Sequence, residues 1–521
     1  MSRARLFVIF ILLFTISFTY RFYGLTSNHP FWVDEFSTAN QARLVVENGL
    51  TVFTNPNIFF EPHNTLFHFL IGGLYKLFGQ SEFITRLPSV LAGSIVPPLL
   101  FLITYRIFNL NTGIIAGLLA TTSYFQIVWS RQARSYVFVQ LLILLGLYFY
   151  IKILERNKKS TFNVVAFGTV MAIGLFMHSL FYIFVFTLGI HYMIANFNKV
   201  AFWMRKPAVY ITMIIILAFV YYSRLLSSTI ALYANGDIIK ANNVWYYHSF
   251  LWREYGLLSY LSLIGFLLGF LRHRKIISLI LFYVMIHLIF VNFLFAPYTS
   301  RYLLPIWPFI IMGTAYALST FSEIFVKRLR FSAPNLSLTF SLLLVGIIIA
   351  NGHKFVIKPN TFYSVNHDFR EIALIDYHQV YNFIKKKGEL EKGQTAVIDT
   401  WADRQNWYLG HDFPHSYLFR WINHPGLTNG IPMKTEFTLN KEEEKIIPLS
   451  NQRFIGELTD LLKAQKRYPN GFIFIDDATM PKDVIDYAEK NLKKELYLDH
   501  YPLDDNPYSI WPATLYSWGI E

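Results

Sequence analysis

Apolar stretches of helical length recur along the first two thirds of this chain of 521 residues. A helix needs about 20 mostly apolar residues to cross the hydrocarbon core of a bilayer. The chain is 54% hydrophobic and 15% charged, which is too apolar for one soluble domain. The sequence therefore predicts a polytopic α-helical membrane protein. The eleven expected transmembrane helices are Leu6–Gly24, Leu87–Phe108, Thr112–Trp129, Tyr136–Leu154, Phe162–Met177, Leu180–Ala195, Ala208–Leu225, Tyr255–Leu271, Ile276–Phe295, Tyr302–Phe321 and Leu336–Ala350.

Positive residues between these helices indicate the orientation of the chain. Arg3 and Arg5 precede the first one, and no small-residue cleavage site follows it, so we expect an uncleaved anchor with a cytoplasmic N-terminus. The odd number of crossings then places residues 352–521 outside a plasma (inner) membrane. The net charge of +13 is assigned to cytoplasmic loops and not to nucleic-acid binding. Those loops hold Arg106, Lys152, Arg156, Lys158, Lys159, Lys199, Arg205, Lys206, Arg272, Arg274, Lys275, Lys327, Arg328 and Arg330.

One apolar stretch, Thr65–Phe78, is too short to cross the membrane and contains His68 and Lys76. Counting it as a crossing would invert every later helix and would move the basic residues Lys152–Lys159 to the outer side. We therefore expect Thr65–Phe78 to lie in the membrane interface, within the long first outer loop.

After Gly352 the sequence alternates between amphipathic and β-rich segments. We expect a transmembrane domain, residues 1–351, followed by a soluble extracytoplasmic α/β domain, residues 352–521, whose size is ordinary for an independent domain. The chain contains no cysteine, which excludes disulfides and thiolate metal sites. The expected elements are a helix capped by Asp376 and ending at Lys387, a strand Ala396–Thr400, a helix Asn451–Arg467, a strand Phe472–Ile475 and a helix Lys482–Lys494.

Two adjacent acids, Asp34 and Glu35, follow the first transmembrane helix. They lie between Trp32 and Phe36, and apolar surroundings make an ionised carboxylate cost a few kcal/mol. This spacing is consistent with a functional acid pair and also with a solvated pair of loop charges.

Further motifs lie in segments expected on the same outer side of the membrane. Glu61-Pro62-His63 precedes the interfacial helix, Ser130-Arg131-Gln132-Ala133-Arg134-Ser135-Tyr136 opens the fourth transmembrane helix, and Arg301-Tyr302-Leu303-Leu304-Pro305 opens the tenth. Together with Asp34-Glu35, Lys76-Leu77-Phe78-Gly79 and Arg86-Leu87-Pro88, they occur in a consistent order over most of residues 1–320. In this order the chain resembles the membrane-integral (GT-C) glycosyltransferases related to protein O-mannosyltransferases and to the aminoarabinose transferase that modifies lipid A.

The resemblance implies an inverting enzyme that moves one hexosyl or pentosyl unit from a polyprenyl-phosphate donor to a hydroxyl of a glycan, lipid or protein. By position, Asp34 lies at the catalytic centre. An acceptor hydroxyl is far less acidic than Asp, so the base takes its proton as the glycosidic bond forms. The growing charge of a lipid phosphate leaving group needs fixed cations at the interface. The further candidate site residues are the catalytic helpers Glu35 and Glu61, the donor phosphate or lipid ligands Arg131, Arg134, Arg301 and Tyr302, and the substrate contacts His63 and Tyr136.

The chain departs from the family pattern at two places. Asn64-Thr65 stands where relatives have prolines, and Tyr136 stands where the mannosyltransferase and aminoarabinose relatives have a second Asp. Sugar identity and metal use, Mg²⁺ or Mn²⁺, therefore stay open. The lone histidines His178 and His287 are interpreted as packing residues outside the site.

Two other functions remain compatible with these motifs. A transporter or flippase of lipid-linked sugar would also need interfacial arginines, and an inactive paralogue would bind the lipid-linked sugar without transferring it. The same arginines, Arg131, Arg134 and Arg301, would also serve as anchors to lipid headgroups. The large outer domain and the lack of charged residues in the middle of the predicted transmembrane helices favour the enzyme.

Overall fold

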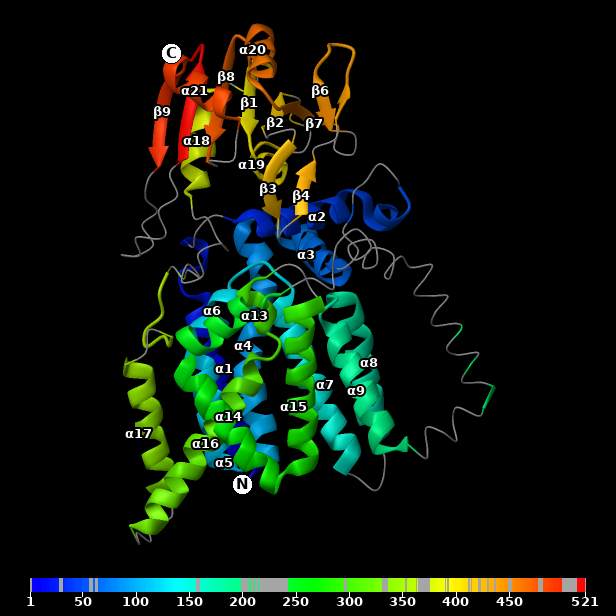
Figure 1. The fold of residues 1–521 in the computed structure, drawn as a ribbon, viewed down its shortest axis with the longest axis vertical. Helices are drawn as coiled ribbons and strands as arrows, with labels where there is room; N and C mark the ends of the chain where they lie inside the picture. Colours follow the sequence, from blue (N-terminus) through cyan, green and yellow to red (C-terminus); the bar gives the residue numbers. More distant parts are fainter. Residues whose placement is uncertain are drawn as a thin grey trace. The chain divides into compact units, whose positions relative to one another are not determined.

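The computed structural model divides into two compact units (Figure 1). The membrane unit comprises Met1–Leu25, Glu61–Leu70 and Arg86–Thr361. The second unit, called the outer unit after the side of the membrane that the sequence predicts for it, comprises Thr26–Phe60, Ile71–Thr85 and Phe362–Glu521. Parts of the first loop, including Asp34 and Glu35, thus belong with the C-terminal segment. The structure describes residues 2–27, 31–55, 60, 64–155, 160–197, 206–207, 210, 214, 242–294, 298–329, 336–351, 354–361, 363, 375–388, 390, 393–410, 413, 415–419, 423–428, 431–434, 437–447, 452–476, 481–498 and 513–520.

The membrane unit is all-helical in its described part. A helix occupies every expected transmembrane segment except Ala208–Leu225, of which the structure describes only residues 210 and 214. The helices are α1 (Arg3–Phe22), α4 (Glu82–Ile107), α5 (Leu110–Thr122), α6 (Tyr124–Ser130), α7 (Tyr136–Glu155), α8 (Thr161–Met177), α9 (Phe181–Ala195), α13 (Val244–Ser249), η5 (Phe250–Glu254), α14 (Gly256–Arg272), α15 (Arg274–Ile289), η6 (Phe290–Leu294), η7 (Ser300–Leu303), α16 (Trp307–Arg328) and α17 (Leu336–Asn351).

Not all of these helices reach the length of a membrane crossing. By length and composition, five described helices could cross a membrane, and the pair Val244–Glu254 and Gly256–Arg272, bent by 95°, would make a sixth. Others are apolar but have only 10–17 residues, among them α8 and α17. The prediction of a polytopic membrane protein is confirmed, whereas the count of eleven crossings stays a prediction.

Two glycines explain how α14 and α16 pack so closely. A Cβ atom on Gly265 would lie 1.8 Å from the main-chain oxygen of Gly313, so only glycine allows the two backbones to approach. Thr314 adds a hydrogen bond of 2.9 Å from its hydroxyl to the carbonyl of Leu258. Helix α16 is mostly buried and packs against α14, α5 and α17.

The expected transmembrane helix Thr112–Trp129 is divided at Ser123 into α5 and α6. The segment after α17 runs across this break: the amide of Val356 donates to the carbonyl of Thr122 at 2.7 Å, and the amide of Tyr124 donates to the carbonyl of Lys354 at 2.9 Å. A buried backbone group without a partner is costly. Residues 354–361 thus supply partners that the interrupted helix lacks.

The outer unit contains α2 (Val33–Asn48), η2 (Gly49–Phe53) and, from Ile71 onward, the second half of α3 (Thr65–Phe78). The bounds of α3 agree with the prediction. Gly72 allows α3 to lie against α2, because a Cβ atom there would be 3.0 Å from the carbonyl oxygen of Ala42.

The C-terminal segment forms a mixed sheet of eight strands in the order β5-β6-β7-β2-β1-β8-β10-β9. Strands β7, β2, β1 and β8 are parallel, and the strands on either side of them are antiparallel. The strands are β1 (Thr395–Asp399), β2 (Ser416–Phe419), β5 (Thr438–Leu439), β6 (Lys445–Ile447), β7 (Gln452–Ile455), β8 (Asn470–Ile475), β9 (Lys493–Leu498) and β10 (Ala513–Trp518); β3 (Asn423–Thr428) and β4 (Ile431–Lys434) form a separate pair.

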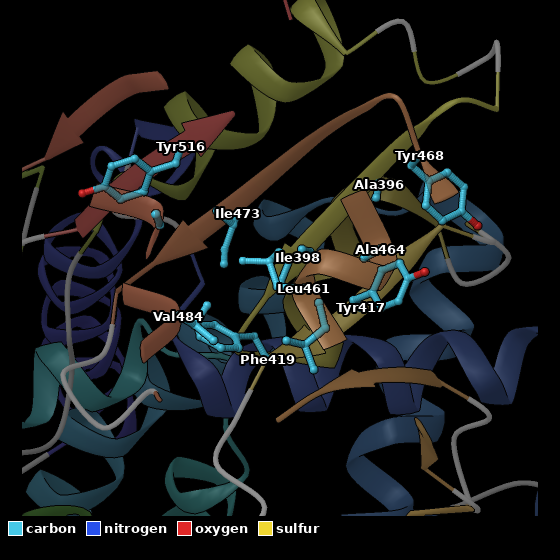
Figure 2. Packing of buried hydrophobic residues seen from close by; sticks show 12 residues of the cluster. Ala396, Ile398, Tyr417, Phe419, Leu461, Ala464, Tyr468, Ile473, Val484 and Tyr516 are labelled. Atoms are coloured by element: carbon cyan, nitrogen blue, oxygen red, sulfur yellow. The ribbon is translucent and has the colours of Figure 1, made fainter. Parts of the chain in front are cut away.

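A compact apolar core lies between this sheet and the helices α20 (Leu458–Arg467) and α21 (Lys482–Asn491). The C-terminal segment also contains α18 (Tyr377–Lys387) and α19 (Ala402–Leu409). Figure 2 shows Ile398, Phe419 and Ile473 of the sheet facing Leu461 and Val484 of the helices. Strand β1 is buried along its whole length, as predicted for a central parallel strand. The prediction of a C-terminal α/β domain is confirmed.

Several element predictions are confirmed and two are corrected. Asp376 caps α18 by accepting from the amide of Gln379 at 3.2 Å. The predicted helix Asn451–Arg467 is wrong in its first part, because Gln452–Ile455 pairs with β2 and β6 as a strand. The predicted helix Lys482–Lys494 ends at Asn491, since Lys493 already pairs with β10. Pairing with distant strands overrides local helical patterns in both cases.

Candidate active site

Asp34 and Glu35 lie in the first turn of α2. The amide of Glu35 donates to the carbonyl of Trp32 at 2.9 Å, so the helix begins directly before the acid pair. Glu35 is fully buried, whereas Asp34 is half-buried. The positive end of the helix dipole stabilises negative charge in this turn. The pair is therefore part of an ordered helix terminus and not of a solvated loop.

Aromatic rings from the C-terminal segment surround this turn. Phe31 lies 5.1 Å from Trp407 between ring centroids, and Phe36 lies 5.7 Å from Tyr408 and 6.0 Å from Tyr377. Both phenylalanines are buried. Buried aromatic rings therefore pack on both sides of the acid pair along the chain.

In the membrane unit, four of the predicted site residues come together. Tyr136 opens α7, and its ring centroid lies 5.6 Å from Cζ of Arg134 and 5.4 Å from Cζ of Arg301. Tyr302 lies 5.8 Å from the same ring. Two guanidinium groups from distant parts of the chain thus converge on one aromatic ring at the N-terminal end of a 20-residue helix. Such a terminus favours anions.

Two histidines that sequence reasoning left out contact this cluster. The ring of His178 lies 4.8 Å from that of Tyr136. His287 is buried in α15, and its Nε2 lies 2.6 Å from the main-chain oxygen of Tyr302. Thr299 caps the same turn, with its hydroxyl accepting from the amide of Arg301 at 3.3 Å. The sequence carries no spacing signal for these contacts, because they join different helices.

Arg131 occupies a different environment from the other two arginines. It is buried, and its Nη1 donates to the carbonyls of Arg21 at 2.9 Å and Tyr23 at 2.7 Å. Its Nη2 donates to the carbonyl of Thr361 at 2.7 Å. Its guanidinium group therefore holds main-chain carbonyls at the end of α1 and beyond α17.

Glu61 and His63 lie outside the described residues. Asn64, one of the two departures from the family pattern, is buried and its Oδ1 accepts from the hydroxyl of Ser135 at 2.7 Å. It thus joins the start of α3 to the loop that carries Arg134. Within the described ranges, no group of three or more His, Asp or Glu side chains is placed to hold a metal ion.

The comparisons with known proteins agree with this architecture. Residues 62–223 match the family model described as dolichyl-phosphate-mannose-protein mannosyltransferase. No curated protein sequence matches the chain significantly.

Solved structures show the fold over nearly the whole chain. ArnT from Cupriavidus metallidurans, bound to undecaprenyl phosphate, matches with a TM-score of 0.52 at 11% identity, covering 99% of this chain and 98% of that one. The oligosaccharyltransferase AglB from Archaeoglobus fulgidus, with an inhibitory peptide and a dolichol-phosphate, matches with a TM-score of 0.56 at 11% identity. The match covers 95% of this chain and 73% of that one. The oligosaccharyltransferase of the same organism with Zn and sulfate matches with a TM-score of 0.52 at 12% identity, covering 94% of this chain and 71% of that one.

The fold is that of the GT-C glycosyltransferases, polytopic membrane proteins with an α/β domain after the helices. The match of residues 62–223 to the mannosyltransferase family model and the structural match to ArnT confirm the predicted resemblance to the GT-C glycosyltransferases.

Proposed function

We propose that this protein is an inverting glycosyltransferase that moves one sugar from a polyprenyl-phosphate donor to an acceptor hydroxyl. It acts at the extracytoplasmic face of the plasma membrane, on a glycan, lipid or protein acceptor. The observation that carries the proposal is the convergence of Arg134 and Arg301 on the ring of Tyr136. The solved relatives with undecaprenyl phosphate and dolichol-phosphate support a lipid phosphate as the group that this cluster binds.

The arginine pair suits the chemistry of the leaving group. Sugar transfer releases a lipid phosphate whose negative charge grows in the transition state, and fixed cations stabilise such charge most where water is scarce. Arg134 and Arg301 are each half-buried, and their planar groups can hold two phosphate oxygens at once. The N-terminus of α7 adds the positive end of its dipole. Tyr302 and His287 orient the turn that carries Arg301.

Asp34 is the proposed base. An inverting displacement needs one group that accepts the acceptor proton as the new bond forms, and Asp34 is the half-buried acid of the pair. Glu35, buried beside it, orients the helix terminus and adds negative charge. We further propose Glu61 as a helper of Asp34 and His63 as a substrate contact.

A divalent cation is a further part of the proposal that needs its own test. Carboxylate oxygens are the ligands that Mg²⁺ and Mn²⁺ prefer, and the acid pair Asp34 and Glu35 offers them. A related oligosaccharyltransferase was solved with Zn and sulfate. Activity that disappears with EDTA and returns with Mg²⁺ or Mn²⁺ supports the cation, and activity that resists EDTA contradicts it.

The experiment that tests the proposal first identifies the donor lipid and then measures sugar transfer by variants of the two arginines. Lipid extracted from the purified protein is identified by mass spectrometry, and that lipid-linked sugar serves as the donor in a transfer assay. Arg134→Ala and Arg301→Ala each remove a charge-assisted hydrogen bond of about 1.5–3 kcal/mol, so donor affinity falls roughly 10- to 150-fold. Lysine at either position restores only part of this affinity.

Arg272→Ala is the matched control, since this exposed arginine ends α14 away from the cluster. Wild-type affinity in both arginine variants would contradict the phosphate site. Translocation of the lipid without any glycosidic product would support a flippase instead. Binding without transfer or translocation would support an inactive paralogue.

A further inference from the structure

Helix α19 of the outer unit is held tightly on the face that it turns to the sheet. Gln405 is buried, and its Nε2 donates to the carbonyls of Val397 at 3.2 Å and Tyr417 at 2.9 Å. These carbonyls belong to β1 and β2, the first two parallel strands along the chain. One side chain therefore fixes α19 to two adjacent strands.

Arg404 fixes the same helix at the carboxyl ends of β1 and β8. Its guanidinium group makes two hydrogen bonds to Asp399, which ends β1, and one of 2.7 Å to Asp476, which follows β8. Its Cζ lies 4.3 Å from the ring centroid of Tyr377. Arg404, Asp399 and Asp476 are all buried, and together they form an ion-pair cluster that we call the Arg404 fork. Burial of all three charges strongly constrains its geometry.

The outward face of α19 holds α2 (Figure 1). Asn40 donates from Nδ2 to the main-chain oxygen of Asp403 at 2.7 Å and to its Oδ1 at 3.1 Å. Arg43 donates from Nη1 to the main-chain oxygen of Asn406 at 2.9 Å, and its side chain is only 12% exposed. Two polar side chains on α2 thus contact the backbone of α19.

Aromatic contacts continue this attachment to the acid-bearing turn. Phe31 precedes the pair and packs on Trp407, while Phe36 follows it and packs on Tyr408 and Tyr377. Tyr377 also stacks beneath Arg404. The first turn of α2 is therefore connected to the Arg404 fork through one layer of rings.

We propose that the C-terminal α/β domain positions the catalytic acid: α19, fixed to the sheet by Arg404 and Gln405, holds α2 through Asn40 and Arg43 and so orients Asp34. This inference rests on the proposed role of Asp34 as the base. Asn40 and Arg43 act as positioning residues, because they touch α19 and not the reacting atoms. A misplaced base slows the chemical step while donor binding by Arg134 and Arg301 is preserved.

The test uses the full-length protein carrying both Asn40→Ala and Arg43→Ala. We expect kcat to fall about 10- to 100-fold with the donor KM unchanged within twofold. Arg43→Lys, which can still reach the Asn406 carbonyl, restores part of kcat. Asn491→Ala is the matched control. Among the described residues, this exposed side chain bonds only to the carbonyl of Tyr487 in its own helix, and its loss leaves kcat unchanged.

Hydrogen exchange gives a second readout that needs no activity. Amides of the first two turns of α2 should exchange at least tenfold faster in the double variant, while amides of β1 and β8 keep their protection. Unchanged exchange in α2, or unchanged kcat in an active enzyme, would overturn the positioning role. A wild-type protein that transfers no sugar would instead refute the proposed function, and the exchange result would still decide whether α19 holds α2.

Discussion

The guanidinium group of Arg131 and the main-chain carbonyl of Thr361 are joined by a hydrogen bond of 2.7 Å. The same group also holds the carbonyl of Tyr23. Gly24 makes the approach possible, since a Cβ atom there would lie 2.7 Å from Cα of Thr361, and its φ of +64° suits glycine. Two points where the chain leaves the membrane unit are therefore tied together by one buried arginine.

Arg131→Ala should destabilise the protein and leave its donor affinity unchanged. The substitution removes the donors for three main-chain carbonyls, at a cost on the order of 3 kcal/mol. Thermal melting of the detergent-solubilised protein, measured with donor titration, separates this effect from those of Arg134→Ala and Arg301→Ala. A stable Arg131→Ala protein with weakened donor binding would assign Arg131 to the phosphate site.

Asp34→Asn should abolish the general base while keeping the size of the side chain. Transfer is expected to fall at least about 10²-fold with the donor still bound. Glu35→Gln should be milder. Glu489→Gln, at an exposed acid on α21, is the matched control. Near-normal turnover by Asp34→Asn would remove Asp34 from the mechanism.

Asp476 should make the stability of the outer unit depend on pH. Burial raises the pKa of its carboxyl above the ordinary value of 3.8; Arg404 lowers it again and Asp399 raises it further. An acid whose pKa is higher in the folded state stabilises the fold only while protonated. The free energy of unfolding should therefore fall as the pH rises from about 3.8 through the higher folded value.

Asp476→Asn should remove this pH dependence, because an amide stays neutral and can still accept from Arg404 and donate to Thr400. Asp399→Asn should instead cost about 3–5 kcal/mol, since it breaks the two-pronged contact with a buried guanidinium group. Thermal melting from pH 4 to pH 8 of both variants and the wild type tests the difference. Parallel curves for Asp476→Asn and wild type would contradict the assignment.

The absence of cysteine makes the orientation of the chain directly measurable. Asn157→Cys is expected to be cytoplasmic and Lys392→Cys extracytoplasmic, according to the charges of the loops. A membrane-impermeant maleimide added to intact cells should label only Lys392→Cys, and permeabilised cells should label both. Labelling of both sites in intact cells would overturn the eleven-crossing topology and the interfacial assignment of Thr65–Phe78.

The positions of the helices in the membrane unit followed from the sequence, because the length of an apolar stretch is a local property. The bounds of α3, the cap at Asp376 and the buried strand β1 are further features of this kind. The motif that carries Arg134 and Tyr136 was also visible, since both residues lie at one helix end. Local spacing determines which side chains share a helical turn, and this spacing can be read directly from the sequence.

Tertiary packing alone decided which of these residues meet. Arg301 reaches Tyr136 from another helix, Arg131 turns inward to main-chain carbonyls, and Gln452–Ile455 becomes a strand only because β2 and β6 pair with it. The attachment of α2 to α19 likewise joins segments far apart in the chain. Such contacts depend on how apolar faces bury one another across the whole chain, and no local pattern of residues encodes that arrangement.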